Sequence, residues 1–314
     1  MIKAENLEKR FDDFVAVDSL SFEVGEGELL VLLGPNGAGK TTTVRMLSSI
    51  LKPTAGSAVV NGYDVVSQPA CVRRSIGLLT EQPGLYLRMT GMEYLEFYGR
   101  LYGLKDKFIR ERGLALFAQF NMVAAAQRRL GQYSKGMRQK VGLIRTMLHD
   151  PAVLLLDEPT SAMDPHSAKL VRDAIQDMRA DKRSFILCTH NLAEAESLAD
   201  RIVIIKQGKI VAEGSPKGLK NQLLGQPQIE IRVDKHLNGS VQDLSDLVTV
   251  EWVGENGIRY RTPDPERDNP LLVRRLGDLG LGIISVQEVT QSLEDVYLRV
   301  VADEAEHKFA EGTQ

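Results

Sequence analysis

One loop constrains the fold of this 314-residue chain more than any other feature. The apolar run 28–34, ELLVLLG, leads directly into residues 34–42, GPNGAGKTT, which fit the pattern G-x-x-x-x-G-K-[ST]. Glycines let such a backbone wrap tightly and point its N–H groups at phosphate oxygens, and the following helix adds its positive end. We therefore predict a buried strand, a phosphate-binding loop and a helix from Lys40 to about Leu51. The predicted nucleotide contacts are Gly34, Pro35, Asn36, Gly37, Ala38, Gly39, Lys40, Thr41 and Thr42.

A second apolar strand ends in two adjacent acids. Residues 153–160, VLLLDEPT, bring Asp157 and Glu158 to the carboxyl end of a strand, where parallel sheets bind their ligands. Two carboxylates are costly to bury there unless they have a partner. We expect the Thr41 hydroxyl and, through water, Asp157 to bind Mg²⁺, and Glu158 to act as the general base that orients an attacking water. Lys40 is expected to reach the β- and γ-phosphates of ATP.

The first part of the chain has the sequence pattern of an α/β fold. Residues 1 to 222 alternate short apolar strands with segments of helical spacing, which predicts a parallel sheet covered by helices. Residues 1–11 and 19–24 look like antiparallel strands added at one side. The further strands expected in the sheet are 72–80, 152–159, 184–190 and 201–211.

The pattern changes after a linker at 223–228, and residues 227–303 are predicted to form a small α+β domain. Strand alternation on both sides of Glu255-Asn256-Gly257 indicates a hairpin. Trp252 in that hairpin is expected in the core. A helix at 269–280, a strand at 282–289 and a helix at 292–301 follow, the last with Ser292 and Asp295 spaced as a capping box. Residues 304–314 are expected to be a mobile tail.

Composition and charge argue against several other classes, although they do not exclude a local basic patch. The formal net charge of −3 provides no overall basic field for nucleic acid, so no nucleic acid partner is expected. The first residues do not resemble a secretory signal, and no run reaches the ~18 apolar residues of a membrane span. Cys71 and Cys188 are isolated, as in a reducing compartment, which favours a cytoplasmic location.

Residues 133–140, YSKGMRQK, predict a second anion site, 94 residues after the first loop. Ser134 is placed as an N-cap of a helix with apolar residues at helical spacing, namely Met137, Val141, Ile144 and Leu148. Basic residues in a first turn oppose the helix dipole unless an anion is bound there. The alternative is a solvated basic face on a packed helix.

Taken in order, GPNGAGKTT, YSKGMRQK, VLLLDEPT, SAMD and the isolated TH resemble the motifs of ATP-binding cassette (ABC) ATPases over residues 1–222. The resemblance implies an ABC-type nucleotide-binding domain of the P-loop NTPase class, with a RecA-like core, an antiparallel β edge and a helical subdomain at about 83–148. It also implies that two copies pack head to tail. Each ATP then lies between the phosphate loop of one copy and the signature loop of the other, where Ser134 and Gly136 are retained.

The resemblance assigns further positions one at a time. Phe11 resembles the aromatic residue that stacks on adenine, with Phe14 as the less favoured candidate. Asp164 of SAMD resembles the loop between the two ATP sites, and His190 resembles the histidine that contacts the γ-phosphate. The sensor of Mg²⁺ and water, usually Gln, aligns with Glu81. The neighbouring Gln82 is the alternative.

The implied activity is Mg²⁺-dependent hydrolysis of ATP to ADP and phosphate, driving a separate transmembrane permease. Residues 292–301, SLEDVYLRVV, resemble the extension found on ATPases of multidrug, antibiotic or sodium exporters, whose permeases are of the ABC-2 type. The expected partners are such a permease and a second copy or a related ATPase. The expected location is the cytoplasmic face of the cell membrane. The alternatives are a cytosolic ABC ATPase of DNA repair or translation and a module that senses ATP without turnover. A single-site kinase would not need the signature loop.

Overall fold

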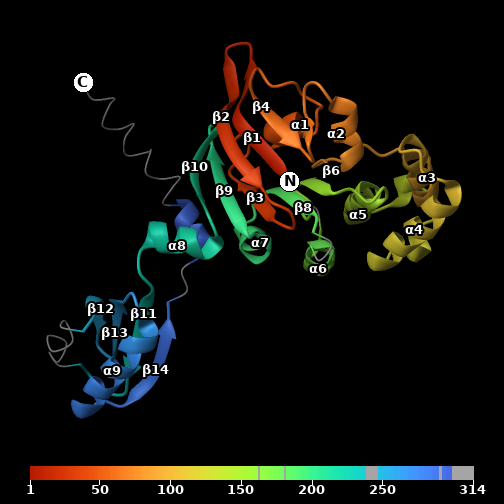
Figure 1. Cartoon of the computed structure of the whole chain (residues 1–314). Coiled ribbons are helices and arrows are strands. Elements are labelled where there is room, and N and C mark those ends of the chain that lie inside the picture. Colours follow the sequence, from red (N-terminus) through yellow and green to blue (C-terminus); the bar gives the residue numbers. More distant parts are fainter. Residues whose placement is uncertain (162, 180–181, 238–246, 290–291, 299–314) are drawn as a thin grey trace. The chain divides into compact units, whose positions relative to one another are not determined.

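The computed structural model describes residues 1–161, 163–179, 182–237, 247–289 and 292–298 (Figure 1). The chain divides into two compact units, Met1–Pro216 and Lys217–Gln314, and each is described by itself. The tail predicted at 304–314 lies outside the described residues.

The first unit is built on a six-stranded sheet with the order β10-β9-β3-β8-β7-β6. All neighbouring strands are parallel except β9 and β10, which form an antiparallel hairpin. The predicted parallel sheet is therefore confirmed. The strands, in sheet order, are β10 (Lys209–Gly214), β9 (Arg201–Lys206), β3 (Leu29–Leu33), β8 (Ser184–Thr189), β7 (Val153–Asp157) and β6 (Ile76–Leu79).

Both faces of this sheet are buried, as expected for parallel strands. On one face, Leu30, Leu155 and Ile186 belong to a core cluster that also contains Leu47 of α1 (Lys40–Leu47). On the other face lie α6 (Pro165–Arg179) and α7 (Leu192–Leu198), below the sheet in Figure 1. The helix α1 ends four residues earlier than predicted, since Ser49 turns to a positive φ of 54°.

A second sheet, β2-β1-β4-β5, is antiparallel throughout and covers α1 from the other side. The strands predicted at the N-terminus pair with each other as expected. The segment 55–60 was not predicted, because only its residues 58 and 60 are buried and the alternation is too short to recognise. The strands are β1 (Ile2–Phe11), β2 (Phe14–Val24), β4 (Ala55–Val60) and β5 (Tyr63–Asp64).

The segment predicted as a strand at 72–80 begins as a helix. The helix α2 (Pro69–Ser75) starts with a proline at its first position, where proline is favoured, and β6 begins only at Ile76. The pattern of apolar residues does not locate the change from helix to strand, because Val72 of α2 and Ile76 of β6 are both buried.

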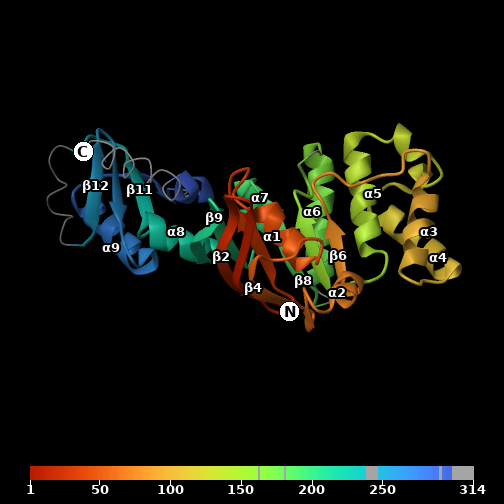
Figure 2. The ribbon, with the colours of Figure 1, turned by 90° about the horizontal axis from the view of Figure 1, so that it is seen from above.

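Helices α3 (Gly91–Leu101), α4 (Asp106–Gln119) and α5 (Lys135–Met147) pack on one another and group at one end of the unit in Figures 1 and 2. Two short 3₁₀ helices, Val123–Ala125 and Leu130–Gln132, lie between α4 and α5.

The helix α5 is clamped onto β6. Its Arg145 Nη2 and Thr146 Oγ1 both donate to the carbonyl of Leu78, at 2.9 and 3.1 Å. A Cβ on Gly77 would lie 2.4 Å from the Thr146 carbonyl, so only glycine permits this close approach. Along α5, the predicted core residues Val141, Ile144 and Leu148 are buried, whereas Met137 is only partly buried.

The second unit contains a four-stranded antiparallel sheet, β12-β13-β11-β14, with α9 (Pro265–Asp278) packed on it. Its core cluster includes Ile231, Tyr260 and Leu272. The predicted hairpin is confirmed, and so is the capping box, in which Ser292 and Asp295 each accept from the other's backbone N–H. The strands are β11 (Gln228–Val233), β12 (Thr249–Gly254), β13 (Gly257–Arg261) and β14 (Ile283–Glu288).

Two expectations for this unit need correction. The helix predicted to begin at 269 begins at Pro265, with Asp264 as its cap and Pro270 inside it. Trp252, predicted in the core, is 47% exposed. Its indole covers Gly254 and lies 5.1 Å from the Arg259 guanidinium, so it packs on the open face of the hairpin.

The division between the units falls upstream of the linker expected at 223–228. The helix α8 (Pro216–Leu224) belongs with the second unit because Arg261 Nη1 donates to the carbonyls of Leu224 and Gln226, both at 2.7 Å.

Replacing Leu155 by alanine is expected to lower the free energy of unfolding by about 2–5 kcal/mol, since a fully buried leucine is lost from the middle of the main sheet. Urea unfolding followed by far-UV circular dichroism measures this. Val59→Ala is the control, because Val59 is 38% exposed on β4. Equal losses for the two variants would contradict this account of the core.

Candidate functional site

The two predicted motifs meet in one pocket of the first unit. The pocket opens where β3, β7, β8 and β6 end, which is where parallel sheets place their ligands. Its lining residues are Phe14, Ala16, Asn36, Gly37, Ala38, Gly39, Lys40, Thr41, Thr42, Glu81, Asp157, Glu158, Ser161 and His190.

The loop between β3 and α1 depends on its glycines. A Cβ on Gly34 would lie 2.2 Å from the carbonyl oxygen of Ile205 in β9, and one on Gly39 would lie 2.6 Å from that of Ala16. Gly39 also has a φ of 107°, which disfavours other residues. The loop is therefore held against two neighbouring strands by backbone contacts that no side chain would permit.

The ammonium group of Lys40 is buried within this loop. Its Nζ donates to the carbonyls of Gly34 and Pro35, at 2.6 and 3.0 Å. These carbonyls stabilise the buried charge and hold it at the base of the pocket. Gly34 and Pro35 themselves lie outside the lining, and their carbonyls hold the Lys40 ammonium group.

Three oxygen-bearing side chains come together beside the loop. The Thr41 hydroxyl donates to Asp157 Oδ2 at 2.8 Å, and Glu81 lines the same pocket. Burial raises the pKa of Asp157. The Thr41 hydrogen bond opposes this shift, and the charges of Glu158 and Glu81 add to it. A cation among these oxygens would favour the ionised carboxylate.

The donor set suits Mg²⁺, which takes one or two carboxylates and completes its shell with phosphate and water. Within the described residues, no group of three or more His, Cys, Asp or Glu side chains forms a complete metal site. Gln82 is outside the lining, and its carbonyl accepts from Thr80 Oγ1, so the geometry favours Glu81 over Gln82.

Glu158 and His190 form a pair at the mouth of the pocket. The Nδ1 atom of His190 lies 2.7 Å from Glu158 Oε1. The glutamate is buried, whereas the His190 side chain is 59% exposed. Glu158 has a positive φ of 52°, a strained conformation, and its backbone N–H donates to the carbonyl of Cys188 at 2.9 Å. Strain of this kind is typical of functional sites.

The aromatic residue at the pocket is Phe14 and not the favoured Phe11. Phe14 and Ala16 lie two residues apart on β2, on the same side of that strand, and both line the pocket. Phe11 is outside the lining, and the Lys9 ammonium lies over its ring at 5.1 Å. The geometry of the pocket therefore favours Phe14 over Phe11.

The remaining predicted residues lie elsewhere in the first unit. Ser134 and Gly136 do not line the pocket, and neither does Asp164. Ser134 caps α5 as predicted, accepting from the backbone N–H of Met137 at 3.2 Å. Asp164 accepts from the backbone N–H of Ser167, which lowers the pKa of Asp164.

Sequence reasoning missed two lining residues. Ala16 has no chemical signature, and only the pairing of β2 brings it to the loop. Ser161 follows the acidic motif directly, and its hydroxyl donates to the carbonyl of Glu158 at 3.2 Å. Its place three residues after Glu158 was the available signal.

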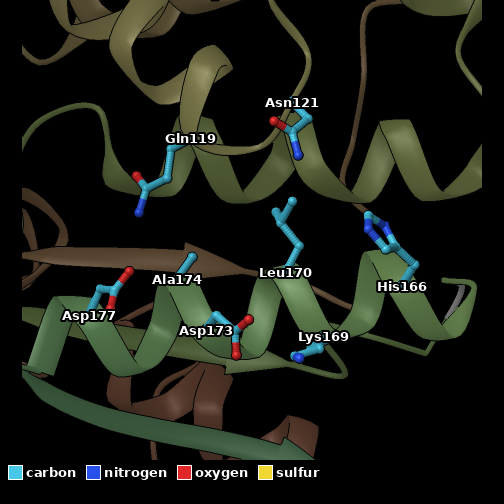
Figure 3. A pocket seen from close by; sticks show the side chains of 8 residues that line it. All are labelled: Gln119, Asn121, His166, Lys169, Leu170, Asp173, Ala174 and Asp177. Carbon is cyan, nitrogen blue, oxygen red and sulfur yellow. The ribbon is translucent and has the colours of Figure 1, made fainter.

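A second pocket in this unit has a different character. Gln119 and Asn121, at the end of α4, face side chains of α6 across it (Figure 3). It has no glycine loop and no strand ends, so it lacks the arrangement of the phosphate-binding loop in the first pocket. The residues from α6 are His166, Lys169, Leu170, Asp173, Ala174 and Asp177.

Comparisons with known proteins agree with this geometry. A family model described as ABC transporter matches residues 17–161, and one described as ATP-binding protein DrrA1-3-like, C-terminal domain matches 214–301. Daunorubicin resistance ATP-binding protein DrrA2 of Streptomyces coeruleorubidus is 38% identical over 311 residues, covering 98% of this chain and 96% of that protein. Nod factor export ATP-binding protein I of Rhizobium sp. (strain N33) is 36% identical over 310 residues, covering 97% and 98%.

Solved structures show the same fold. A chain described as the ATP binding subunit of an ABC transporter matches with a TM-score of 0.67 and 28% identity, over 72% of this chain and 94% of that chain. A bacterial ABC transporter cassette, MJ0796, matches with a TM-score of 0.65 at 24% identity, over 68% and 98%. In the part of the chain that the structure describes, no helix combines the length and apolarity needed to cross a membrane.

Replacing Gly39 by alanine is expected to lower the affinity for ATP more than the same change at Gly37. Both have positive φ, so each substitution costs about 1–2 kcal/mol of backbone strain. At Gly39 the added methyl group also meets the Ala16 carbonyl, whereas at Gly37 it meets nothing within 4 Å. Titration with a fluorescent ATP analogue should show the larger loss of affinity for Gly39→Ala. Equal losses would show that the contact with β2 has no importance.

Proposed function

Because this chain belongs to the family of ABC transporter ATP-binding proteins, which hydrolyse ATP, we propose that it powers a separate exporter permease through ATP-driven closure of a head-to-tail dimer. One observation carries the proposal: the phosphate loop, the Asp157–Thr41 pair and the Glu158–His190 pair all open into one pocket. The names of the relatives, which concern drug resistance and Nod factor export, support export as the direction.

We assign ATP binding to the loop between β3 and α1. Its backbone N–H groups and the positive end of α1 face the phosphates. Lys40, already at the base of the pocket, exchanges its carbonyl partners for phosphate oxygens. Phe14 is the ring placed to stack on the adenine, because it is the aromatic residue of the lining.

Thr41, Asp157 and Glu81 would hold Mg²⁺. When bound, the ion neutralises charge on the β- and γ-phosphates. Asp157 accepts from Thr41 at 2.8 Å, so its carboxylate is already aimed at the position beside the phosphate loop. Its raised pKa is the result of burial, which a bound cation offsets.

Glu158 is the group we assign to the attacking water. Its carboxylate accepts a proton from the water as the water oxygen attacks the γ-phosphorus, and the bond between that phosphorus and the bridging oxygen breaks to release ADP. His190 Nδ1 holds the carboxylate in place at 2.7 Å, and Nε2 of the same ring is left to meet the γ-phosphate. The exposure of His190 supports a contact of this kind at the mouth of the pocket.

The molecule that closes over the bound ATP is a second copy of the chain or a related ATPase. Ser134 and Gly136 at the start of α5 lie outside the pocket of their own chain, so they are available to the γ-phosphate of a partner. The first turn of α5 contains no acid and includes Lys135. Its N–H groups and positive end suit a phosphate. We assign Asp164 to the loop between the two sites.

The permease is expected to be of the ABC-2 type, and the chain is expected to lie on the cytoplasmic face of the membrane through it. We place the permease contact at residues 81–87, next to Glu81. Tyr86 and Leu87 there are each 50% exposed, and the Tyr86 ring packs edge to face with Phe97 at 5.4 Å. An exposed aromatic surface beside the metal ligands suits a contact that responds to ATP.

Glu158→Gln is expected to bind ATP and accumulate as a dimer while steady-state turnover falls by about 100-fold or more, because the amide cannot accept the proton. Phosphate release and size-exclusion chromatography with ATP measure the two effects. Gln139→Glu is not a suitable control, since Gln139 Nε2 donates to the Glu158 carbonyl. Glu196→Gln, on α7, makes the same chemical change at an exposed site. Rapid hydrolysis by Glu158→Gln would refute the assignment of the base.

Ser134→Arg is expected to block the dimer while leaving ATP affinity of the monomer within about threefold. The bulky cation would fill the space that the partner's phosphate occupies. Equilibrium titration and light scattering separate the two effects. Ser57→Arg adds the same charge on exposed β4 and should dimerise normally. Equal loss of monomer binding would argue against a role across the dimer.

A further inference from the structure

Glu194 is a buried carboxylate that the reaction described above does not use. It lies in α7 and is 1% exposed. Oε1 accepts from the Thr160 hydroxyl and Oε2 accepts from the Thr189 hydroxyl, both at 2.8 Å. Burial raises the pKa of Glu194, and the two hydroxyls oppose that shift. A carboxylate whose hydrogen-bond donors are neutral hydroxyls is costly to bury, so its position calls for an explanation.

The two threonines stand next to the catalytic pair. Thr160 lies two residues after Glu158, in the segment that follows β7, and Thr189 is the last residue of β8 and immediately precedes His190. The carboxylate of Glu194 therefore joins the ends of two neighbouring strands at the points where Glu158 and His190 leave them.

The turn that carries His190 is closed by the same residue. The Thr189 hydroxyl also accepts from the backbone N–H of Asn191, at 3.0 Å, and Asn191 Oδ1 accepts from the backbone N–H of Glu194, at 3.1 Å. Thr189, Asn191 and Glu194 are thus joined to one another by hydrogen bonds, and His190 lies in the turn that these bonds close. These hydrogen bonds fix the backbone of the turn on both sides of His190. The imidazole of His190 is directed at Glu158.

On the β7 side, the Thr160 bond acts on a strained segment. Glu158 has a positive φ, and its backbone is tied to β8 by the Cys188 carbonyl. Strained backbone persists only where the surroundings determine it strongly. The bond from Thr160 to Glu194 is the side-chain link that holds the segment after Glu158 against α7.

We propose that Glu194 is a positioning residue, which couples Thr160 to Thr189 and thereby fixes the carboxylate of Glu158 relative to the imidazole of His190. The inference rests on the roles proposed for Glu158 and His190 and adds the element that aligns them. Glu194 is not among the residues that line the pocket. It acts by keeping the two strand ends in one register, so its loss lowers the rate of chemistry and leaves nucleotide binding in place.

Thr160→Val tests this with little change in shape. Valine keeps the volume and removes the hydroxyl that binds Glu194, whereas Thr160→Ser keeps the hydroxyl and is the matched control. Steady-state ATP hydrolysis by the full chain should show kcat lowered by about 10–100-fold for Thr160→Val, with the Kd for ATP changed by less than about threefold. Thr160→Ser should keep most of the rate. An unchanged kcat in Thr160→Val would overturn the proposal.

A double-mutant cycle separates positioning from a merely structural role. If Thr160 acts through Glu158, then Thr160→Val should cost little further in the Glu158→Gln background, measured by single-turnover hydrolysis. The same fold-loss in both backgrounds, or a parallel loss of ATP affinity that Thr160→Ser does not restore, would show that the bridge only stabilises the fold. That outcome also overturns the proposal.

The proposed role of Glu158 as base and the proposed positioning role of Glu194 can be refuted separately. Rapid turnover by Glu158→Gln alone removes the proposed base, whatever Thr160→Val does. Loss of turnover in Glu158→Gln together with a normal rate in Thr160→Val removes only the positioning role of Glu194.

Discussion

The structure of the first unit depends on how it accommodates charge at the ends of buried strands. Lys40, Asp157, Glu158 and Glu194 are all buried within or beside one pocket. Each has a different compensating partner: carbonyls for Lys40, the Thr41 hydroxyl for Asp157, the His190 ring for Glu158, and two threonines for Glu194. Because a buried polar group without a partner is costly, these bonds fix the geometry around the nucleotide before it binds.

The apolar strands make that arrangement possible. The residues of β3, β7 and β8 are buried on both faces, so the strands cannot slide relative to one another without exposing or misplacing side chains. Their carboxyl ends are thereby held at one edge of the sheet. The polar residues that follow each strand therefore lie at the same edge of the sheet. For this reason, segments more than a hundred residues apart meet in one pocket.

Much of this follows from local pattern. The phosphate loop, the acids at the end of β7 and the strand–helix alternation each depend on neighbours in the sequence, and the parallel sheet was predicted from them. The resemblance favours Phe11 over Phe14, because position along the chain does not show that, of the two, only Phe14 lines the pocket. Trp252 was assigned to the core by its alternation alone, although its indole packs on Gly254 at the surface. The role of Glu194 requires two strands and a helix together, which no local pattern describes.

The clamp between α5 and β6 has a mechanical consequence. A helix of 13 residues is a rod about 20 Å long, with Ser134 at one end and, near the other, the two bonds to the Leu78 carbonyl. Such a rod transmits rotation with little bending, since its backbone is fully hydrogen-bonded along its length. In the proposed dimer, a phosphate bound at the Ser134 end would therefore turn β6, the strand that leads to Glu81. In the proposed dimer, occupancy of one ATP site would therefore displace the residues that we propose as Mg²⁺ ligands at the other site, without any change in the fold of the parts between them.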